Sequence, residues 1–423
     1  MNLLRQKIEQ EIRERGPIPF SRYMELCLYD PELGYYSRNA EQFGKAGDFY
    51  TSSDVHAVFG RLLARQFDEM WRILGRPERI TLMELGPGRG LFAQDVLDWS
   101  EKKFPDFFCA VQYVLVESSP ALRERIEATL REHLESGRAT LMPDSSRAEE
   151  ATPSGAKTQT QGEAQTAALK RCATEDRIAF AAPAPPFPTI LFANEFFDAL
   201  PLEIGSSQGS LRVDSQNGRF VETWAPASAE ELEFLDRYST HPEPGERVEV
   251  PLQSQLHMRT AATLDCGFIV VIDYGYTRAE QLAGRHRGTL KAIRQHSLSA
   301  NPYEAPGEQD ITADVNFTAL AAVAEEQGMQ VQKLVTQSQF LMGIGEANQF
   351  ADAFEDCRLP QIPLLAQRTR EKWGTRETKV ALQLKHLVTP AGTGESFHVL
   401  VASKGAEAER VAALSGLNFG HWT

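Results

Sequence analysis

The chain has 423 residues, 42% hydrophobic and 24% charged, which is enough to build a large buried core and more than one ordinary domain. Its formal net charge of −14 disfavours phosphate backbones and anionic membranes as partners, so we expect no nucleic-acid substrate. No apolar run approaches the roughly 20 residues that a membrane helix needs. The composition therefore predicts a two-lobed globular protein without membrane insertion.

The N-terminal segment predicts an amphipathic helix rather than a targeting signal. Leu4, Ile8 and Ile12 recur every four residues, and Gly16 and Pro17 end the pattern. The acidic residues in this segment argue against a mitochondrial presequence. Five cysteines without a C-x-x-C pair and histidines without H-E-x-x-H spacing indicate neither disulfides nor a metal site. We expect a reducing, cytoplasmic location and no bound metal.

Residues 1–75 are expected to form an N-terminal lobe of helices and loops. Two of its stretches, 29–36 and 43–49, are loop-forming and rich in aromatic residues and glycine. Aromatic residues there either bind a partner from exposed loops or pack the lobe onto the core, and packing is the favoured interpretation. Asp48 and Thr51 are the polar candidates of this region.

An apolar strand over 80–84 runs into the most informative motif of the chain. The strand ends at Glu84, and Gly86, Gly88 and Gly90 follow with G-x-G-x-G spacing. Such glycines either form a simple turn or let the backbone approach a ligand where a Cβ would collide. The spacing departs from the dinucleotide fingerprint G-x-G-x-x-G. Since Glu84 would repel phosphates but accept hydrogen bonds from amines and hydroxyls, the motif favours S-adenosylmethionine.

Three further strand ends carry polar residues. Strand 113–116 ends at Glu117, and a carboxylate there is expected to accept hydrogen bonds from ribose hydroxyls. Strand 189–193 is followed directly by Asn194, which we expect to hold cofactor or substrate through its amide. Strand 268–272 ends at Asp273, which we expect to orient the loop after its own strand. These residues should meet at the carboxyl edge of one sheet.

The remaining patterns predict the fold class and the domain organisation. Strands at 80–84, 113–116, 139–142, 189–193 and 268–272 alternate with helical patterns, so residues 76–275 are expected to form an α/β, Rossmann-like core. Residues 148–188 have few aromatics and predict a flexible insertion within this core. Residues 276–378 are expected to form a substrate or lid region.

The C-terminal residues 379–423 are expected to complete the sheet. Segments 379–388 and 397–403 predict two strands, and a connection as short as 389–395 permits only an antiparallel pair. A mostly parallel sheet that finishes in an antiparallel hairpin is typical of Rossmann-like methyltransferases, whereas dehydrogenase sheets normally continue parallel.

On these motifs the chain resembles the MidA-like proteins, relatives of the mitochondrial complex I assembly factor that methylates a protein arginine. The resemblance lies in residues 23–31 with 34–36, 47–49, 84–90, 194–201, 272–275, 288–290 with His296, 306–307, Asp310 and 316–317. It implies a Rossmann-like S-adenosylmethionine methyltransferase with added helical lobes, and protein arginine methylation. The implied partner is a protein with a basic acceptor, with a respiratory-complex subunit as one candidate. The insertion departs from the family pattern.

Glu195 and Asp198 are the candidate catalytic residues for such a reaction. A forked carboxylate contact can orient a planar guanidinium and localise its charge on the nitrogens that do not react. The alternative is that both acids only stabilise a helix N-terminus. His296 and Asp310 belong to a loop-rich segment, 288–317, that is expected to cover the acceptor, although a lone histidine is more often structural.

Three other functions remain open from the sequence. A noncatalytic assembly chaperone could keep this fold and hold a basic client with its acidic surface. A small-molecule methyltransferase is disfavoured because the extra lobes indicate a larger acceptor, and a dehydrogenase is the weakest alternative. The sequence gives neither the client nor the oligomeric state.

Overall fold

The computed structural model describes residues 2–37, 57–142, 187–294, 297–299, 301–354, 381–382, 384–385, 387–389 and 394–418. Asp48, Thr51, His296 and nearly all of the insertion predicted at 148–188 lie outside the described residues.

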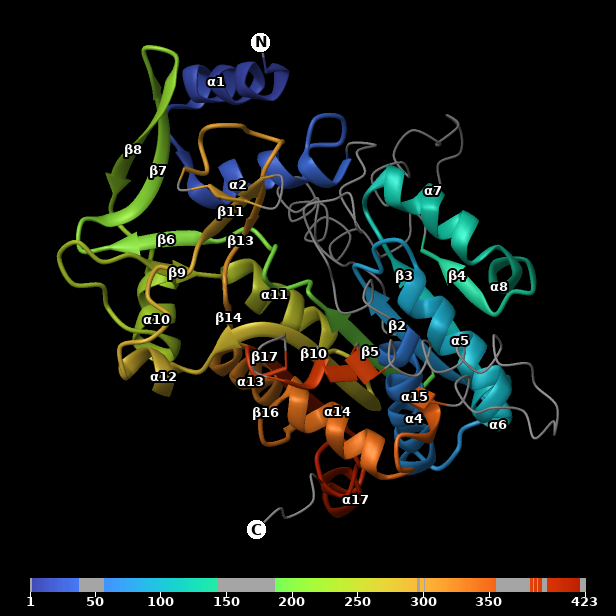
Figure 1. The fold of residues 1–423 in the computed structure, drawn as a ribbon. Coiled ribbons are helices and arrows are strands. Elements are labelled where there is room, and N and C mark those ends of the chain that lie inside the picture. The colour runs from blue at the N-terminus through green and yellow to red at the C-terminus, as the bar shows by residue number, and fades with distance from the viewer. Residues whose placement is uncertain are drawn as a thin grey trace, which may run out of the picture.

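Within the described residues, a nine-stranded sheet forms the centre of the molecule (Figure 1). Its main path runs β4-β3-β2-β5-β10-β17-β15, while β14 pairs with β10 and β16 with β17. The strands from β4 to β10 are mutually parallel, and β17 is antiparallel to β10. The strands are β2 (Ile80–Leu85), β3 (Val111–Val116), β4 (Ala139–Leu141), β5 (Thr189–Asn194), β10 (Gly267–Tyr276), β14 (Val315–Asn316), β15 (Gln330–Val331), β16 (Val335–Thr336) and β17 (Phe397–Lys404).

The mostly parallel sheet with antiparallel strands at one edge confirms the predicted fold class. The predicted strand at 379–388 is wrong, because the described residues among 381–388 are helical. Leu384, Leu387 and Val388 have the i, i+3, i+4 spacing of a helix stripe, and they pack against the hydrophobic core. The antiparallel neighbours of β17 are instead β10 and the short strands β15 and β16.

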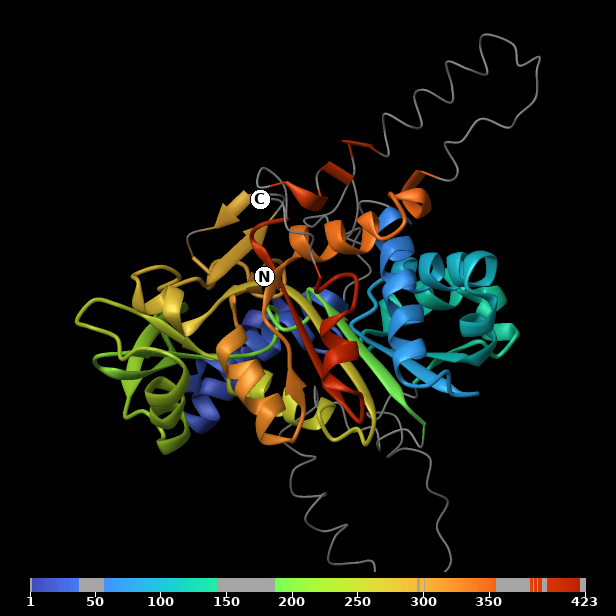
Figure 2. The ribbon, with the colours of Figure 1, turned by 90° about the horizontal axis from the view of Figure 1, so that it is seen from below.

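Helices cover both faces of the central sheet. Alternate side chains of one face, such as Leu82 and Phe192, pack with α4, α5 and α14, and those of the other face, such as Met83 and Leu191, pack with α11 and α13. Figure 2 shows the blue to cyan helices at one end of the sheet and the green to yellow lobe at the other. The helices are α4 (Ala57–Ile73), α5 (Leu91–Lys103), α6 (Pro105–Ala110), α7 (Pro120–Thr129), α8 (Arg131–Glu135), α11 (Leu252–Ala261), α13 (Phe317–Glu326), α14 (Gln337–Glu346), α15 (Ala351–Phe354) and α17 (Ala408–Ala412).

Two smaller sheets and the first helices form a lobe with its own core (Figure 1). Buried residues of α1, α2, β6, β7 and β13 share one hydrophobic cluster, so the N-terminal helices join segments that are far away in sequence. The division of the chain into four parts stays a prediction, although α4, which it assigned to the N-terminal lobe, packs on the central sheet. The elements are α1 (Leu3–Arg15), β1 (Ile18–Pro19), α2 (Phe20–Tyr29), η1 (Tyr35–Ser37), β6 (Glu203–Ser206), β7 (Gly209–Gln216), β8 (Arg219–Ala225), α10 (Ala229–Tyr238), β9 (Val248–Val250), α12 (Arg278–Leu282), β11 (Lys291–Arg294), β12 (Ser297–Ser299) and β13 (Asp310–Thr312).

Among the described helices, none is both long and apolar enough to cross a bilayer.

Candidate active site

The candidate site lies where the strand order reverses. From β2 the chain proceeds to β3 and β4 on one side, and β5 then pairs with β2 on the other side. Open parallel sheets bind ligands beyond the carboxyl ends of the strands at such a switch point. The glycine motif follows β2, and Asn194 ends β5, so the two motifs that were singled out in the sequence meet there.

The glycine turn has the backbone that its sequence predicts. Gly86, Gly88 and Gly90 all have positive φ, at +63°, +55° and +76°, which side chains rarely adopt. A Cβ on Gly86 would lie 2.9 Å from the ring of Phe196, in the turn after β5. A Cβ on Gly88 would meet no heavy atom of the described residues within 4 Å. The turn therefore packs closely against the next strand end at Gly86 and opens at Gly88, as a ligand cradle requires.

Glu84 is more deeply buried than its predicted binding role suggests. The side chain is 4% exposed, and Oε2 accepts a 2.8 Å hydrogen bond from the Tyr113 hydroxyl. Burial raises the pKa of Glu84 to about 8, against the opposing effect of this hydrogen bond. At neutral pH the carboxyl is therefore mostly protonated. The hydrogen bond between Tyr113 and Glu84 helps to hold together β3 and β2, the strand that leads into the glycine turn. The contact of Glu84 with a ligand stays a prediction.

Glu117 lies beside the glycine turn at the end of β3. Its Oε1 accepts a 2.8 Å hydrogen bond from the Ser119 backbone N–H. Burial raises the pKa of Glu117 to about 7, while backbone N–H groups, including that of Gly88, oppose the rise. The contact with Gly88 places this carboxylate at the open part of the cradle, where it can accept hydrogen bonds from a ligand's hydroxyl groups.

We expect the affinity for S-adenosylmethionine to rise about tenfold between pH 6 and pH 8, because the ionised fraction of a group with a pKa of about 7 rises by that factor. Only the ionised Glu117 has both oxygens free of protons and able to accept ligand hydrogen bonds. Calorimetry at both pH values would measure this. The rise should be much smaller in Glu117→Gln and unchanged in Glu127→Gln, which alters an exposed residue of α7. Equal pH dependence in all three proteins would contradict this role.

The turn after β5 is held by a buried carboxylate on the neighbouring strand. Oδ2 of Asp273 lies 3.2, 3.0 and 3.3 Å from the backbone nitrogens of Phe196, Phe197 and Asp198, which donate to it. Oδ1 accepts from the Tyr274 N–H at 2.9 Å. Successive N–H groups around one anion form a compact nest. Asp273 thus holds the turn after β5, while its predicted effect on the loop after its own strand stays a prediction, because Tyr274 still belongs to β10.

That turn brings the predicted acids and Asn194 together. Glu195 has a φ of +50°, which is uncommon for a residue with a side chain, and its carboxylate accepts a 3.2 Å hydrogen bond from Asn194 Nδ2. Oδ1 of Asn194 and Oδ1 of Asp198 are both buried, and neither has a hydrogen-bond partner among the described residues. Buried oxygens normally have donors, so both atoms are suited to receive donors from a ligand.

Asp198 is the buried acid of the group. It is 4% exposed, and its Oδ2 accepts a hydrogen bond from the Tyr274 hydroxyl. Burial raises the pKa of Asp198 to about 6, opposed by the Tyr274 hydroxyl, then by the backbone N–H groups of Ala199 and Asp198, and last by the charge of Lys291. The carboxylate is therefore mostly ionised at neutral pH. Its alternative role as a helix N-terminal acid is not supported, because no described helix starts in the turn that follows.

Residues that the sequence did not assign to the site close it from the N-terminal lobe. The Tyr29 hydroxyl donates to the Ala199 carbonyl at 3.0 Å, and the Tyr36 hydroxyl donates to Asp310 Oδ1 at 2.9 Å. Ser119 Oγ donates to the Tyr36 carbonyl at 2.6 Å. The aromatic stretch 29–36 thus packs the lobe onto the site rather than lying exposed. Buried tyrosine hydroxyls need partners, but the sequence could not say which.

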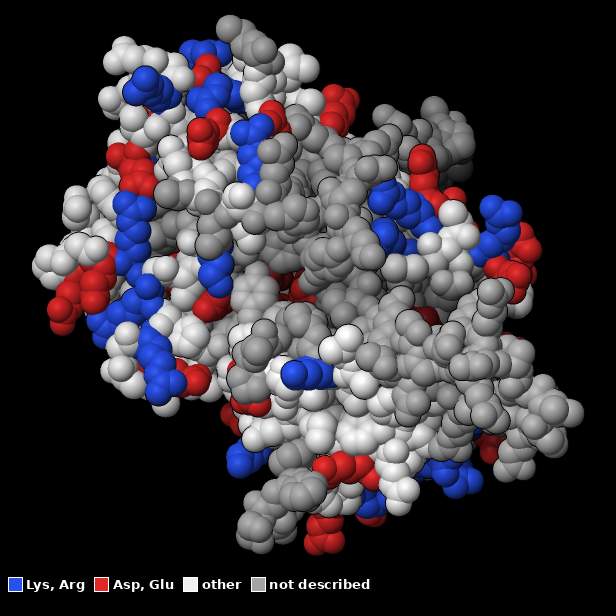
Figure 3. Space-filling model, viewed as in Figure 1, with Lys and Arg blue, Asp and Glu red and all other residues white. Residues whose placement is uncertain are grey.

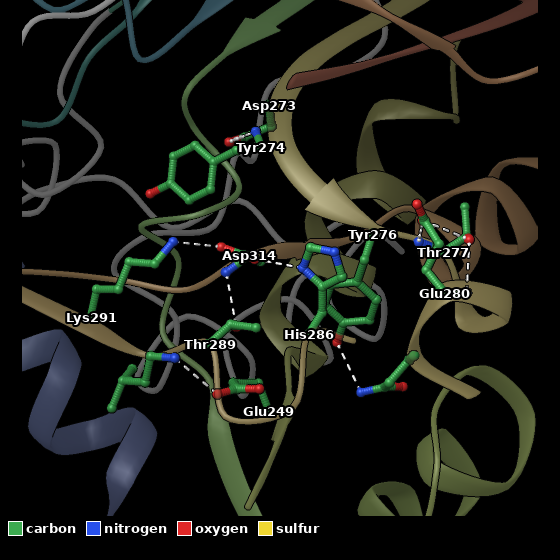
Figure 4. Close-up of polar contacts among 12 residues, drawn as sticks. Glu249, Asp273, Tyr274, Tyr276, Thr277, Glu280, His286, Thr289, Lys291 and Asp314 are labelled. Atoms are coloured by element: carbon green, nitrogen blue, oxygen red, sulfur yellow. Dashed lines mark hydrogen bonds and ion pairs between the residues drawn. The ribbon is translucent and has the colours of Figure 1, made fainter. Parts of the chain in front are cut away.

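Asp310 is linked to the site by its hydrogen bond from Tyr36, and its predicted position over the acceptor stays a prediction. Tyr274 and Lys291 were also missed from the sequence, and Figure 4 shows Tyr274 next to Asp273 on β10 and Lys291 on β11 with its ammonium bonded to Asp314. Over the face in Figure 3, lysine and arginine side chains are interspersed with acidic ones. In the described part of the chain, no three histidines, cysteines or acids are grouped to hold a metal ion.

This set of groups fits S-adenosylmethionine. The open space at Gly88 would admit backbone contact with the ligand, Glu117 would accept from hydroxyl groups, and Asn194 Oδ1 offers an oxygen that needs a donor. The ligand supplies a methyl group on a positively charged sulfur, which an acidic, partly buried crevice attracts.

Comparisons with known proteins agree with this geometry. Residues 62–335 match the family described as "Putative S-adenosyl-L-methionine-dependent methyltransferase". A Drosophila melanogaster protein, named protein arginine methyltransferase NDUFAF7 homolog, mitochondrial, is 30% identical over 345 residues, covering 77% of this chain and 70% of its own. The Danio rerio protein arginine methyltransferase NDUFAF7 is 30% identical over 362 residues, covering 80% and 75%.

A solved structure agrees over nearly the whole chain. A Burkholderia thailandensis protein crystallised with S-adenosyl-homocysteine is 25% identical and has a TM-score of 0.74, covering 99% of this chain and 95% of its own. The resemblance and the cofactor inferred from the motifs are thereby confirmed. The chain belongs to the family of S-adenosyl-L-methionine-dependent methyltransferases.

Proposed function

We propose that this chain transfers a methyl group from S-adenosylmethionine to an arginine side chain of a protein. The observation that carries the proposal is the buried Oδ1 of Asp198, which has no hydrogen-bond partner among the described residues and lies in the same turn as Asn194 and Glu195 at the switch point. A guanidinium has five N–H donors in a fixed plane, and carboxylates are its natural acceptors. The names of the fly and zebrafish relatives support the same acceptor.

The reaction depends mainly on positioning. A guanidinium is a weak nucleophile because it is charged and its lone pairs are delocalised. Asp198 and Glu195 would orient its plane and hold positive charge on the nitrogens that do not react. The turn that carries both acids is fixed by Asp273, so the guanidinium would be held in one orientation, which is the largest contribution such a site can make.

We expect Glu195→Gln to lower methyl transfer to arginine peptides by at least a hundredfold while the affinity for S-adenosylmethionine stays within threefold, because the change removes one acceptor charge and keeps the shape. Mass spectrometry of peptides after incubation with S-adenosylmethionine would measure the transfer. Glu230→Gln, an exposed change in the first turn of α10, should behave as the unmodified chain. Wild-type protein that binds the cofactor but marks no arginine would contradict the proposal.

A noncatalytic chaperone makes a different prediction from the same variant. A chaperone would retain its client with Glu195→Gln, and no methylarginine would be found on that client in cells with or without this gene.

We further propose that the client is a basic protein, with a respiratory-complex subunit as one candidate, and that methylation takes place in the cytoplasm. Fractionation of cells with a tagged chain would test the location.

A further inference from the structure

A row of polar side chains leads away from Asp198, and Figure 4 shows the part of it that runs from Tyr274 through Lys291 and Asp314 to His286. The Tyr274 hydroxyl donates to Asp198 Oδ2, and Lys291 Nζ lies 5.1 Å from the centroid of the Tyr274 ring. Nζ also donates to Asp314 Oδ1 at 2.9 Å, and Asp314 Oδ2 lies 2.9 Å from His286 Nδ1. The row therefore joins the buried acid to an ammonium group that is about half-buried on β11.

Lys291 is held firmly in this position. Its partner Asp314 is fixed by His286 and by a 3.1 Å hydrogen bond from its own N–H to Thr289 Oγ1. The ammonium over the face of Tyr274 makes a cation–π contact, which is stronger where water is excluded. The lysine is thus bound on one side by a carboxylate and on the other by the phenol that contacts Asp198.

The groups that face Asp198 come from several elements. The acids near Asp198 are Glu195 in the same turn, Asp273 on β10 and Asp310 on β13. The nearby phenols are Tyr274 on β10, Tyr29 on α2 and Tyr36 on η1. The nearby cation is Lys291 on β11. Burial favours a neutral Asp198 carboxyl, while the Tyr274 hydroxyl, the backbone N–H groups of Ala199 and Asp198, and the charge of Lys291 favour the carboxylate.

We propose that Tyr274 and Lys291 are positioning residues that keep Asp198 ionised, with Oδ1 directed to the acceptor so that it takes the proton released during methyl transfer. The inference rests on the proposed function. The hydroxyl of Tyr274 occupies Oδ2, which leaves Oδ1 as the oxygen without a partner among the described residues.

The proton balance explains why such a group is needed. The guanidinium nitrogen forms a bond to the methyl carbon, the carbon–sulfur bond breaks, and its electron pair stays on the sulfur. The nitrogen then loses a proton, because the methylated guanidinium carries the same single charge as before. Asp198 Oδ1 accepts that proton and later releases it to solvent. A protonated Asp198 could neither orient the guanidinium by charge nor take the proton.

The test is the pH profile of kcat for arginine methylation. Lys291→Met should move the acid limb upward by about half a pH unit or more, with at least about twofold lower kcat at pH 6 and little change at pH 8.5, since loss of a nearby positive charge favours the neutral carboxyl. Tyr274→Phe should shift the limb in the same direction, and Lys291→Arg should restore the original profile. Lys404→Met is the matched control, because Lys404 Nζ binds the Gln327 carbonyl beside the start of β10, at the other end of that strand from Tyr274.

Calorimetry with S-adenosylmethionine would confirm that each variant is folded. Unchanged acid limbs in folded Lys291→Met and Tyr274→Phe would overturn the inference. A second measurement separates it from the proposed function: the carbon chemical shift of the Asp198 carboxyl, assigned by comparison with Asp198→Asn, gives its pKa without any turnover. If wild-type protein methylates no arginine, the proposed function fails, whereas a titration midpoint unmoved by Lys291→Met removes the inference itself.

Discussion

Gly88→Val is expected to lower the affinity for S-adenosylmethionine by at least a hundredfold. A Cβ at this position meets no atom within 4 Å in the part of the chain that the structure describes, so the two methyl groups of valine would project into the open part of the cradle. The φ of +55° adds backbone strain, because β-branched residues rarely adopt positive φ. Calorimetry would measure the affinity, and a thermal melt would show the cost to stability.

A matched variant separates occlusion of the cradle from strain. Gly137 also has positive φ, +72°, and a Cβ added there would also have no heavy atom within 4 Å, but it lies before β4, at the amino ends of the parallel strands. Gly137→Val should lose similar stability, of the order of 1–3 kcal/mol, and retain cofactor affinity. Equal affinities in the two variants would mean that the glycine turn is not the cradle.

Asp273→Ala is expected to cost both stability and rate. Three backbone N–H groups of the turn after β5 would lose their acceptor in a fully buried position, at a cost of about 3 kcal/mol or more. The turn carries Asp198, and a displacement of about 1 Å at a reacting group can lower the rate about a hundredfold. We therefore expect kcat to fall by at least that factor, measured with saturating cofactor and peptide.

Two further variants make this expectation specific. Asp273→Asn keeps an oxygen that can accept the three N–H groups, so its loss of rate should be several times smaller. Glu231→Ala removes another buried acid, which accepts from the Ser228 N–H and the Ser210 hydroxyl at the start of α10. It should lower the melting temperature and leave kcat unchanged. A kcat of Asp273→Ala near that of the unmodified chain would show that the turn needs no such support.

Local patterns in the sequence were sufficient for the central sheet. Each strand of the parallel path from β4 to β10 was predicted within a few residues, because short apolar runs between turn residues are typical of strands in a parallel sheet, whereas the two-residue strand β14 was not predicted. The strand predicted at 379–388 was wrong for a physical reason. Its apolar residues fit both a loose strand alternation and the helical i, i+3, i+4 spacing. The described residues of the segment form a helix whose apolar residues pack against the core and whose Leu387 and Val388 carbonyls accept hydrogen bonds from α14.

The candidate site was predictable where its residues follow a strand and unpredictable elsewhere. Glu117, Asn194, Glu195 and Asp198 were found because carboxyl ends of parallel strands converge at one edge. The burial of Glu84 against Tyr113 depends on a contact between two strands, which no spacing within one segment contains.

The sequence by itself determined the glycine turn, the order of the strand ends and the family, because these depend on residues close together in the chain. Three contacts appear only in the tertiary structure: Asp273 accepts from the turn after β5, Tyr36 binds Asp310 from the N-terminal lobe, and Lys291 lies over the ring of Tyr274, whose hydroxyl donates to Asp198. Charges and hydrogen-bond partners are set by distance in space, and in this fold β11 and the N-terminal lobe reach the site from distant segments of the chain.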